Sequence, residues 1–412
     1  MKRLIKMIES IVYTNPTECQ LLVTNMCGRY RKPVCVFLPW VCAAHLPCSV
    51  PSTQCYRQHC KINETMEFVW SEVEDNDAIK AECKGYKAGL VRSDPGGWTM
   101  QPTTAAMCPT FASMDVRQND VWVVSYPKTG TTWTQELVWQ VANNLDLAGG
   151  KVDLNERFPF LELDTLTDFT WLFPGIRGKI ASLIFNCVVW WKGVRFCHPH
   201  SWLGYNSFAE QLRAVPGSER RFIKTHLPLS LLPPNLVSTA KVIYVARNPK
   251  DVMVSYYHHH KLVKGHGYVG DLPQFANRFM NDEIMMGPFF KHVEEGWTLK
   301  DNLLFIFYED MKRDLKTVIK RVSHFLESSL TDEQDGQLIQ HLDIETFRNN
   351  PAVNNEFCKT VGLFEDEGNF IRKGEVGGWK EDFAKFADVE INFDNWVVEK
   401  MTKSKVDFPV LQ

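Results

Sequence analysis

Residues 120–145 read DVWVVSYPKTGTTWTQELVWQVANNL, and this stretch decides the fold. Val121–Val124 is a continuous apolar run with β-branched side chains, which is typical of a strand buried on both faces of a sheet. Pro127 ends the run, and a short loop follows. Beyond the loop an apolar residue recurs at every fourth position, which predicts a helix with one apolar face. The residues of this row are Trp133, Leu137, Val141 and Leu145.

The loop between the predicted strand and helix has the composition of an anion-binding site. Free backbone N–H groups and the positive end of the helix dipole point at whatever lies in such a loop. Lys128 adds a full charge, and the residues that complete the loop are Thr129, Gly130, Thr131 and Thr132. The order differs from that of a Walker A loop, because the lysine precedes the glycine here. An ordinary strand–loop–helix turn is the alternative that this stretch alone leaves open.

Composition sets broad limits on the protein. A chain of 412 residues that is 44% hydrophobic can bury a large core in one large or two ordinary domains. The net charge of −3 gives no reason to expect a nucleic acid as partner. The 12 cysteines are unevenly spread, and their spacing does not match that of a zinc site. We therefore expect a reduced, cytoplasmic protein.

Residues 1–62 differ from the rest of the chain and are expected to form an N-terminal extension, either disordered or an artefact of the gene model. Val34–Val50 is apolar and follows basic residues, which is the pattern of a membrane anchor or a late signal sequence. The run is short for a membrane span and contains Pro39 and Pro47, so no membrane partner is expected.

Residues 165–208 form a second unusual segment, expected to be an insertion in a main domain at 63–412 or the product of a retained intron. Ile180–Trp191 within it is apolar enough for a strand or a buried helix. His198 and His200 flank a proline there, but two histidines without further ligands do not predict a metal site.

Three further apolar runs predict strands, and helical patterns separate them. The runs are Arg221–Thr225, Lys241–Ala246 and Leu303–Tyr308. One helix is expected to begin at Pro249, a favoured first helical residue, and another covers 315–326 with apolar residues on one face. Strands that alternate with helices predict an α/β fold with a central parallel sheet and helices on both of its faces.

Polar side chains lie where each predicted strand ends. They are Lys128, Lys224 with His226, Arg247, and Tyr308 with Glu309. In open α/β sheets, ligands bind at the carboxyl ends of the strands. Because four separate segments bring such groups to one edge, the pattern predicts a single ligand site there rather than one isolated basic loop.

Four motifs together resemble those of the cytosolic sulfotransferases, including the insect-type members. They are YPKTGTTW (126–133), FIKTHLP (222–228), ARNPKDVMVSYYH (246–258) and FIRKGEVGGWK (370–380). The resemblance covers about Glu64 to Leu411, except the segment 165–208. It implies transfer of a sulfuryl group from 3′-phosphoadenosine 5′-phosphosulfate to a hydroxyl or amine of a small molecule, without a metal ion.

The resemblance also implies where the donor binds. Its 5′-phosphosulfate would lie at residues 128–132 and Lys224. Its 3′-phosphate would be held by Arg247, Ser255, Arg372 and Lys373, with Gly374 letting the loop backbone close over it. The adenine would meet Trp133, Tyr308 and Ile344. Ile344 and Gly378 depart from the family pattern, since a phenylalanine is expected at position 344.

His226 is the candidate general base, because an imidazole titrates near neutral pH and can take the proton of an attacking hydroxyl. Lys128 and Lys224 are expected to stabilise the bridging oxygen as its bond to sulfur breaks. A sulfuryl group carries less negative charge than a phosphoryl group, so lysines can do the work that Mg²⁺ does in kinases. Phe160 and His259 are expected to line the acceptor pocket, and a histidine at 259 indicates a more polar acceptor.

Other readings stay open. A P-loop kinase or nucleotide phosphotransferase would need the Walker lysine position and a carboxylate for Mg²⁺, and the sequence has neither. A catalytically impaired nucleotide-binding homologue remains the main alternative. The triplet His258–His260 cannot chelate a metal well, because consecutive helical residues point in different directions. A homodimer is left open, since the family's dimer motif is not evident near residues 380–390.

Overall fold

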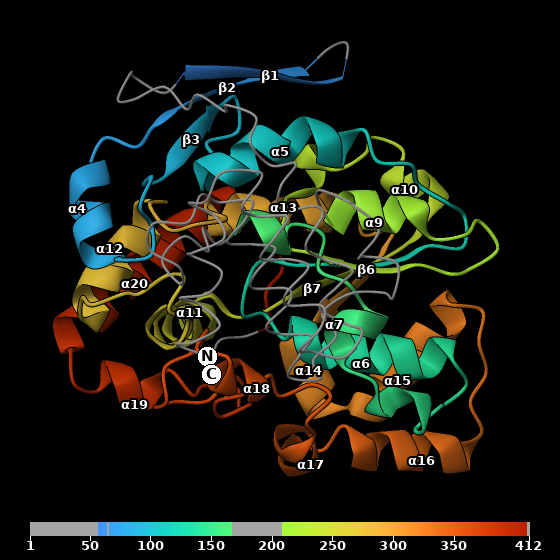
Figure 1. Ribbon diagram of the computed structural model, residues 1–412. Helices are drawn as coiled ribbons and strands as arrows, with labels where there is room; N and C mark the ends of the chain where they lie inside the picture. The colour runs from blue at the N-terminus through green and yellow to red at the C-terminus, as the bar shows by residue number, and fades with distance from the viewer. Residues whose placement is uncertain (1–56, 64–65, 167–207, 410–412) are drawn as a thin grey trace, which may run out of the picture. The chain divides into compact units, whose positions relative to one another are not determined.

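The computed structural model describes residues 57–63, 66–166 and 208–409, and within them the strands form two four-stranded sheets (Figure 1). The first sheet is antiparallel, in the order β1-β2-β3-β4, and the second is parallel, in the order β6-β5-β7-β8. The strands are β1 (Arg57–Asn63), β2 (Met66–Glu72), β3 (Val91–Asp94), β4 (Thr99–Met100), β5 (Val121–Val124), β6 (Phe222–Thr225), β7 (Lys241–Ala246) and β8 (Leu304–Phe307).

Helices follow or separate these strands. The longer ones are α5 (Pro102–Ala112), α6 (Thr131–Ala142), α11 (Pro249–Leu262), α12 (Leu272–Met280), α13 (Phe289–Thr298), α15 (Leu315–Phe325), α16 (Asp332–His341) and α20 (Ala387–Lys403). The shorter ones are α4 (Asn76–Glu82), α7 (Leu154–Arg157), α9 (Phe208–Ala214), α10 (Leu236–Thr239), α14 (Tyr308–Arg313), α17 (Ile344–Asn349), α18 (Phe357–Thr360) and α19 (Lys380–Phe383).

The parallel sheet is the element that positions the site. Val121 pairs with Phe222 on one side and Lys241 on the other, so β5 lies at the centre of the three strands. All four residues of β5 are buried, as the continuous apolar run predicts. The α/β fold with a central parallel sheet is therefore confirmed.

One face of the parallel sheet packs against the helices that follow β5 and β8. Val123, Ile243 and Ile306 on this face contact apolar residues of α6, α15, α16 and α17. α15 supplies Val318, Ile319 and Val322 to this core, as the predicted apolar row requires. α6 ends at Ala142, so Leu145 lies beyond the helix rather than on its apolar row, which corrects the expected length of that helix.

The opposite face of the sheet carries the second core cluster. Its residues come from the sheet, from α11, α12, α13 and α20, and from the antiparallel sheet with α5. Trp122, Tyr244 and Tyr256 are fully buried in it. The two faces of β5 therefore enter two different cores, with Val121 and Val123 on one side and Trp122 and Val124 on the other.

A buried ion pair closes the amino-terminal edge of the parallel sheet. Arg221 Nε lies 2.7 Å from Asp120 Oδ1 and its Nη2 lies 2.5 Å from Oδ2, so the pair is bidentate. Arg221 also donates to the carbonyls of Leu212 and Asp115. The predicted strand began at Arg221, but β6 begins at Phe222. Arg221 therefore lies just before the strand.

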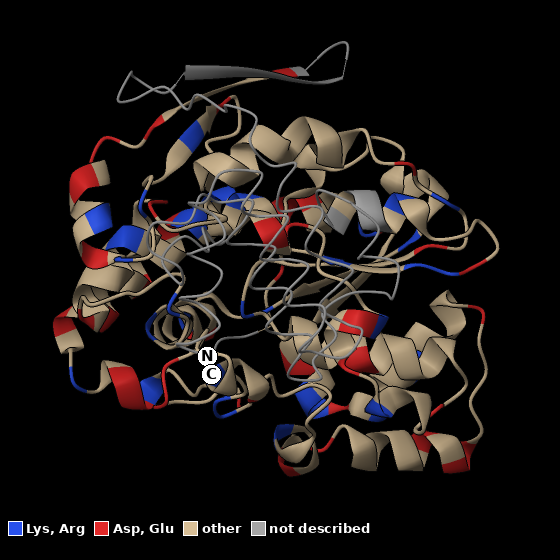
Figure 2. Cartoon of the chain, viewed as in Figure 1, with Lys and Arg blue, Asp and Glu red and all other residues tan. Residues whose placement is uncertain are grey.

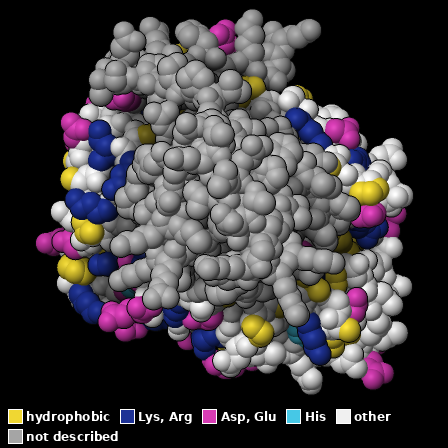
Figure 3. All heavy atoms as spheres, viewed as in Figure 1, with side chains coloured by type: hydrophobic (Ala, Val, Ile, Leu, Met, Phe, Trp, Pro, Cys, Tyr) yellow, Lys and Arg dark blue, Asp and Glu magenta, His cyan; other side chains and the backbone are white. Residues whose placement is uncertain are grey.

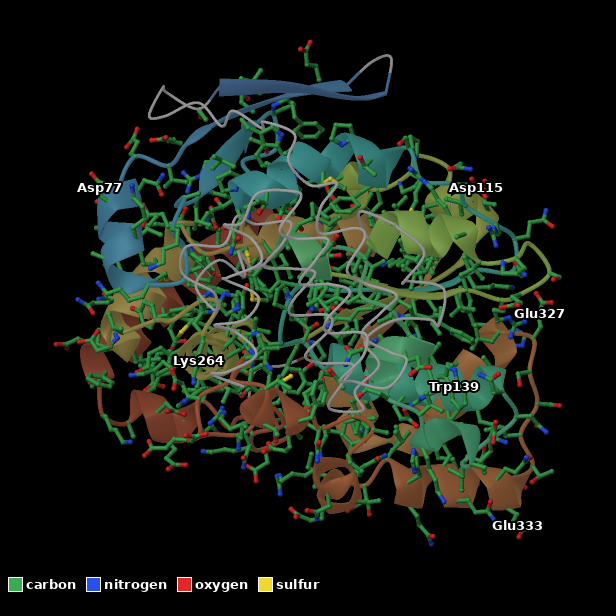
Figure 4. All side chains as sticks on the ribbon, viewed as in Figure 1. Asp77, Asp115, Trp139, Lys264, Glu327 and Glu333 are labelled. Atoms are coloured by element: carbon green, nitrogen blue, oxygen red, sulfur yellow. The ribbon has the colours of Figure 1, made fainter. Side chains whose placement is uncertain are left out.

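Charges elsewhere are spread over the helices around the sheet, with both signs present (Figure 2). The part of the described surface that is visible in Figure 3 shows Lys and Arg side chains interspersed with Asp and Glu. Asp77 and Glu327, labelled at the periphery in Figure 4, belong to exposed pairs with Lys80 and Lys241 at 2.8 and 2.7 Å. Such exposed pairs contribute little to stability.

Three of the segments singled out in the sequence lie outside the residues that the structure describes. The segment 167–207, with the predicted apolar run 180–191 and the histidine pair at 198 and 200, lies outside them, as does Val34–Val50. In the part of the chain that the structure covers, no helix is both long and apolar enough for a membrane span. The strand Arg57–Asn63 pairs with β2 through most of its length.

Candidate functional site

The predicted site residues meet at the carboxyl edge of the parallel sheet. β5, β6, β7 and β8 run in the same direction, so their carboxyl ends share one edge. Lys128 follows β5, Lys224 lies in the last two residues of β6, Arg247 follows β7 and Tyr308 follows β8. The structure therefore brings the four segments together as the sequence predicts.

The loop after β5 has two unusual backbone positions. Lys128 has φ = 69°, a left-handed conformation that costs a non-glycine residue about 1–2 kcal/mol. Gly130 has φ = 101°, and a Cβ there would lie 2.5 Å from the ring of Tyr308. Only glycine lets the loop backbone approach Tyr308 so closely, and strain of this kind is typical of a ligand clamp.

The hydroxyl groups of the loop have different partners. Thr131 Oγ1 lies 2.7 Å from Ser125 Oγ, and Thr129 donates to the carbonyl of Tyr126. The Thr129 hydroxyl is therefore directed at the protein, so an anion in the loop would meet the backbone of this residue. Thr132 is half-buried. The N-cap residue of α6 is Gly130, which has no side chain that could accept a hydrogen bond from the first N–H groups of the helix. The first N–H groups of α6 have no partners within the helix and can receive an anion.

His226 is held in one tautomer. Its Nδ1 lies 2.8 Å from the carbonyl oxygen of Ser125, and a carbonyl can only accept, so Nδ1 carries the proton. Nε2 of the neutral ring is then unprotonated. Burial and the charge of Lys224 hold the pKa of His226 well below its usual value, which keeps the ring neutral.

A buried carboxylate, which sequence reasoning missed, fastens the strand end that carries His226. Glu162 accepts the backbone N–H of His226 at 2.5 Å and the hydroxyl of Thr225 at 2.8 Å. Burial raises the pKa of Glu162 to about 7, although the Lys224 charge opposes this shift. These contacts join residues more than sixty positions apart, so no local pattern could have revealed them.

The two lysines carry positive charge in a confined place. Burial, together with the charges of Lys224, Arg247 and Arg372, lowers the pKa of Lys128 to about 7. Burial likewise lowers the pKa of Lys224 to about 8, against the raising effect of Glu162. An anion bound near both ammonium groups would favour their charged forms and raise these pKa values.

Lys224 and His226 share a neighbour in Phe160. The Lys224 ammonium lies 4.0 Å from the Phe160 ring centroid, and the rings of Phe160 and His226 are 5.1 Å apart. Phe160 pairs with Lys224 as an isolated parallel bridge, so the chain before η2 (Leu163–Thr165) extends the sheet by one residue. The structure thus places Phe160 directly beside the candidate catalytic residues.

A second cationic cluster joins α11 to the loop 370–379. Arg247 Nη2 donates to the carbonyl of Glu375 at 2.6 Å, and Asp251 accepts the backbone N–H groups of Gly377 and Trp379. Arg247 also lies 3.6 Å from Asp251. Asp251, also missed by sequence reasoning, therefore holds the loop against α11.

The arginines of this cluster have unused donors. Arg247 Nε and Arg372 Nε are buried and have no hydrogen-bond partner among the described residues. Arg372 pairs with Asp382 at 3.3 Å, and burial together with the Arg247 charge lowers its pKa. Lys373 is the most peripheral member, because it pairs with Glu381. Ser255 is half-buried, two turns along α11 from Arg247.

Aromatic and aliphatic residues lie between the two cationic clusters. Arg247 lies 4.3 Å from the centroid of the Tyr308 ring, and the rings of Tyr308 and Trp133 are 5.6 Å apart. Trp133 Nε1 donates to the carbonyl of Leu342, just before α17. Ile344, the first residue of α17, lies so close to Gly374 that a Cβ there would be 2.2 Å from Ile344 Cδ1. Trp133 and Tyr308 are thus neighbours, and Ile344 lies two residues beyond the carbonyl to which Trp133 donates.

His258, His259 and His260 point to different partners, as expected for consecutive helical residues. His258 lies 2.9 Å from Asp382, and His260 bonds to Tyr86. The His259 ring lies 5.9 Å from Phe370, whose own ring lies 4.4 Å from the Lys128 ammonium. His259 therefore borders the site, whereas no set of three metal-binding side chains occurs in the described ranges.

Comparison with known proteins agrees with this geometry. A family model described as the sulfotransferase domain matches residues 118–405. The luciferin sulfotransferase of Photinus pyralis is 35% identical over 301 residues, which is 71% of this chain and 74% of that protein. Sulfotransferase 1 family member D1 of Rattus norvegicus is 32% identical over 300 residues, which is 72% of this chain and 88% of the relative.

Solved structures extend the likeness to three dimensions. Retinol dehydratase in complex with androsterone and the inactive cofactor PAP has a TM-score of 0.73 and 31% identity, covering 83% of this chain and 98% of that chain. Its complex with retinol and PAP has the same TM-score of 0.73. The chain therefore belongs to the sulfotransferase family, whose enzymes transfer a sulfuryl group from 3′-phosphoadenosine 5′-phosphosulfate to small-molecule acceptors.

Proposed function

We propose that the carboxyl edge of the parallel sheet binds 3′-phosphoadenosine 5′-phosphosulfate across both cationic clusters. The 5′-phosphosulfate lies at residues 128–132 and Lys224, and the 3′-phosphate lies at Arg247, Ser255, Arg372 and Lys373. The observation that carries this proposal is the pair of buried, unpartnered Nε donors on Arg247 and Arg372. Two arginines from distant segments repel each other, and a dianionic phosphate relieves the repulsion with bidentate hydrogen bonds.

The adenine is proposed to lie between the clusters, against Trp133, Tyr308 and Ile344. The close contact of Ile344 with Gly374 supports this, because it brings α17 to the same loop that carries Arg372 and Lys373. An aliphatic side chain can pack on a purine face with less π overlap than a phenylalanine. Gly374 has φ = 68°, which favours glycine, and the backbone N–H groups of Gly377 and Trp379 donate to Asp251 of α11, so the loop lies close to this helix.

His226 is proposed to act as the general base. The acceptor hydroxyl gives its proton to Nε2 of His226 while its oxygen forms a bond to sulfur. The hydrogen bond from Nδ1 to Ser125 supports this role, because it leaves Nε2 unprotonated. The anionic donor offsets the lysine charges that lower the pKa of His226, so the imidazole becomes a stronger base once donor has bound.

Lys128 and Lys224 are proposed to stabilise the charge that develops as the bond between sulfur and the bridging oxygen breaks. The electron pair of that bond remains on the bridging oxygen, which two ammonium groups can neutralise. Their lowered pKa values, about 7 and about 8, support positions that favour an anion. Lysines in these positions supply the charge stabilisation that Mg²⁺ supplies in kinases, so we propose a metal-independent reaction.

The acceptor is proposed to be a small molecule with a hydroxyl or amine group, bound beside Phe160 and His259. Retinol and androsterone, named in the two related complexes, and luciferin, named in the relative from Photinus pyralis, support a small organic acceptor.

We further propose that the catalytic domain covers residues 63–412, with 1–62 as an extension and 165–208 as an insertion. The proposed location is the cytoplasm, without a nucleic-acid or membrane partner. The proposed assembly is a monomer or a homodimer.

A second candidate is a homologue that binds the donor without efficient turnover. Ile344 favours it, because the family pattern has a phenylalanine at this position and an aliphatic side chain marks a departure from that donor site.

One experiment distinguishes the two candidates. The protein is incubated with donor labelled in the sulfuryl group and with a panel of phenols, alcohols and amines, and binding of adenosine 3′,5′-bisphosphate and of AMP is measured by calorimetry. The proposal expects label in at least one acceptor and much tighter binding of the bisphosphate. Tight bisphosphate binding without label in any acceptor favours the second candidate, and equal affinity for the two nucleotides contradicts the proposed 3′-phosphate site.

A further inference from the structure

A buried chain of hydrogen bonds lies behind the acceptor side of the site. Tyr86 Oη is 3.0 Å from Nε2 of His260 and 3.0 Å from Nδ1 of His266. The two imidazole rings stack with centroids 4.3 Å apart. All three side chains are buried, and Tyr86 is more than 170 residues away from the two histidines in the chain. The mechanism proposed above uses none of these groups.

The chain has a direction that follows from its far end. His260 Nδ1 lies 3.0 Å from the carbonyl oxygen of Tyr256, which can only accept, so Nδ1 carries the proton. Nε2 of the neutral His260 must then accept, and the Tyr86 hydroxyl donates its one proton to it. The Tyr86 oxygen can only accept from His266, so Nδ1 of His266 carries a proton and Nε2 of His266 is unprotonated.

Both histidines have reason to be neutral, which this assignment requires. Burial lowers the pKa of His266 to about 3, and the positive charge of Lys128 adds to the effect. Burial and the neighbouring His266 hold the pKa of His260 well below its usual range. Burial also raises the pKa of Tyr86, so its hydroxyl keeps its proton.

Contacts of known length connect His266 to the transfer site. The His266 ring lies 5.4 Å from the ring of His259, and His259 lies 5.9 Å from Phe370. The Phe370 ring in turn lies 4.4 Å from the ammonium of Lys128. His259 Nδ1 is buried without a hydrogen-bond partner in the described part of the chain. A buried polar atom without a partner is costly, and a ligand group can satisfy it.

We propose that Tyr86 orients the tautomer of His266 so that His266 Nε2 and His259 form a hydrogen-bonding subsite for a second donor group on the acceptor molecule. The preferred acceptor then carries a hydroxyl for sulfuryl transfer and, at its other end, another hydroxyl or N–H group. Tyr86 is a positioning residue, because it acts through His266. This inference rests on the proposed function and adds the chemistry of the acceptor to it.

The test uses two pairs of phenols that differ only in the second group. They are 4,4′-dihydroxybiphenyl with 4-hydroxy-4′-methoxybiphenyl, and hydroquinone with 4-methoxyphenol. Binding to the full chain saturated with adenosine 3′,5′-bisphosphate is measured by calorimetry, and kcat/KM is measured with labelled donor. A methoxy oxygen can only accept a hydrogen bond, and the unprotonated Nε2 of His266 can also only accept one. The methoxy compound therefore cannot form a hydrogen bond with this nitrogen. We expect the hydroxyl compound of at least one pair to be preferred about tenfold, the scale for one polar contact left unpaired.

The variants separate orientation from simple packing. Tyr86→Phe frees His266 to present either nitrogen, so the preference should fall to about twofold or less while adenosine 3′,5′-bisphosphate binds as before. His266→Phe should abolish the preference. Tyr257→Phe is the matched control, because among the described residues its hydroxyl is hydrogen-bonded only to the Lys261 ammonium, at 3.3 Å, and it should keep the preference. Loss of affinity for both members of a pair alike in Tyr86→Phe would mean a structural role and overturn the proposal.

A spectroscopic measurement needs neither variants nor turnover. The nitrogen resonances of histidine in the unsubstituted protein should show His266 protonated at Nδ1 and bare at Nε2. The opposite tautomer, or the absence of a preference within both pairs, overturns the inference. Sulfuryl transfer to any acceptor in the same assays shows that the proposed function survives such a result, whereas no transfer at all is a failure of the proposed function.

Discussion

The two ends of the central sheet both bury charge, but they treat it differently. At the amino edge, Arg221 and Asp120 form a bidentate pair, and both side chains are fully buried. At the carboxyl edge, neither Lys128 nor Lys224 makes an ion pair with a carboxylate of the described residues. Glu162 is near Lys224, but its oxygens accept hydrogen bonds from Thr225 and from the backbone of His226.

The difference indicates what each edge is for. Burying a charge costs free energy at either edge of the sheet, because the charge loses its hydration. At the amino edge the protein itself supplies the opposite charge. At the carboxyl edge, Glu162 raises the pKa of Lys224 only in part against the larger effect of burial, and the charges near Lys128 are all positive. We propose that a ligand anion supplies the remaining negative charge there. We therefore propose that the amino edge stabilises the fold and that the carboxyl edge binds substrate. Five predictions test this contrast, in order of decreasing expected effect.

The largest effect is expected at the amino edge. Arg221→Met leaves Asp120 buried without its partner, and breaking such a pair costs about 3–5 kcal/mol of unfolding free energy. Urea denaturation measures the loss. The adjacent Arg220→Met is the matched control, because Arg220 is exposed, and it should change stability by less than about 0.5 kcal/mol. Similar stability of the two variants would mean that the pair does not hold this edge.

The second effect concerns catalysis at the opposite edge. His226→Asn removes the proposed base and should lower kcat by about 10²-fold or more, while binding of adenosine 3′,5′-bisphosphate is retained. Steady-state rates with labelled donor and calorimetry give the two quantities. His324→Asn, at an exposed position, serves as the control. A His226 variant with a nearly unchanged rate would assign His226 to structure alone, and loss of rate on adding EDTA would argue against the metal-independent reaction.

The third effect concerns the 3′-phosphate cluster. Arg247→Ala should weaken binding of adenosine 3′,5′-bisphosphate by about 2–5 kcal/mol, the range for breaking a desolvated charge pair. AMP lacks the 3′-phosphate, so its affinity should change much less. Calorimetry of both nucleotides with both proteins measures the difference. Arg313→Ala, at an exposed position, is the control. An equal loss for the two nucleotides would indicate general damage to the loop 370–379.

The fourth effect depends on pH and tests the two buried lysines directly. Burial lowers the pKa of Lys128 to about 7 and that of Lys224 to about 8, so both lysines lose protons as pH rises above these values. A polyanion binds the protonated forms, and its phosphates are already ionised above their second pKa of about 6. Affinity for adenosine 3′,5′-bisphosphate should therefore fall about tenfold or more between about pH 7 and about pH 9.

The same measurement should show proton uptake on binding, seen as a dependence of the calorimetric enthalpy on the ionisation enthalpy of the buffer. Lys128→Met should bind more weakly at the lower pH and show a flatter pH profile. An affinity that is constant over this range would contradict the view that the lysines await a ligand anion.

The smallest effect is expected from the amino-terminal extension. Deletion of residues 1–55 removes the part of the proposed extension 1–62 that precedes β1, and it retains β1 and all strands of the parallel sheet. Affinity for adenosine 3′,5′-bisphosphate should change by less than about twofold, which is under about 0.5 kcal/mol. The full chain is the control. A loss of about tenfold or more would mean that the extension contributes to donor binding, and the proposed domain division would be wrong.

The amino-acid sequence by itself determined the architecture and the edge at which the site lies. The apolar run Val121–Val124, the helical row of α6 and the strand ends at Lys224 and Arg247 are local patterns of burial and backbone period, and these can be read without the fold. The four motifs also identified the family, which the domain match to residues 118–405 confirms.

Only the tertiary structure decided which atoms face the ligand. The tautomer of His226 depends on the Ser125 carbonyl, the anchoring of the strand end depends on Glu162, and the direction of the Tyr86 chain depends on the carbonyl of Tyr256. Each of these hydrogen bonds is set by where the backbone places its partner, and most join residues far apart in the chain. A sequence pattern reports which residues are buried together, whereas hydrogen-bond direction and uncompensated charge arise only once distant segments are packed against one another.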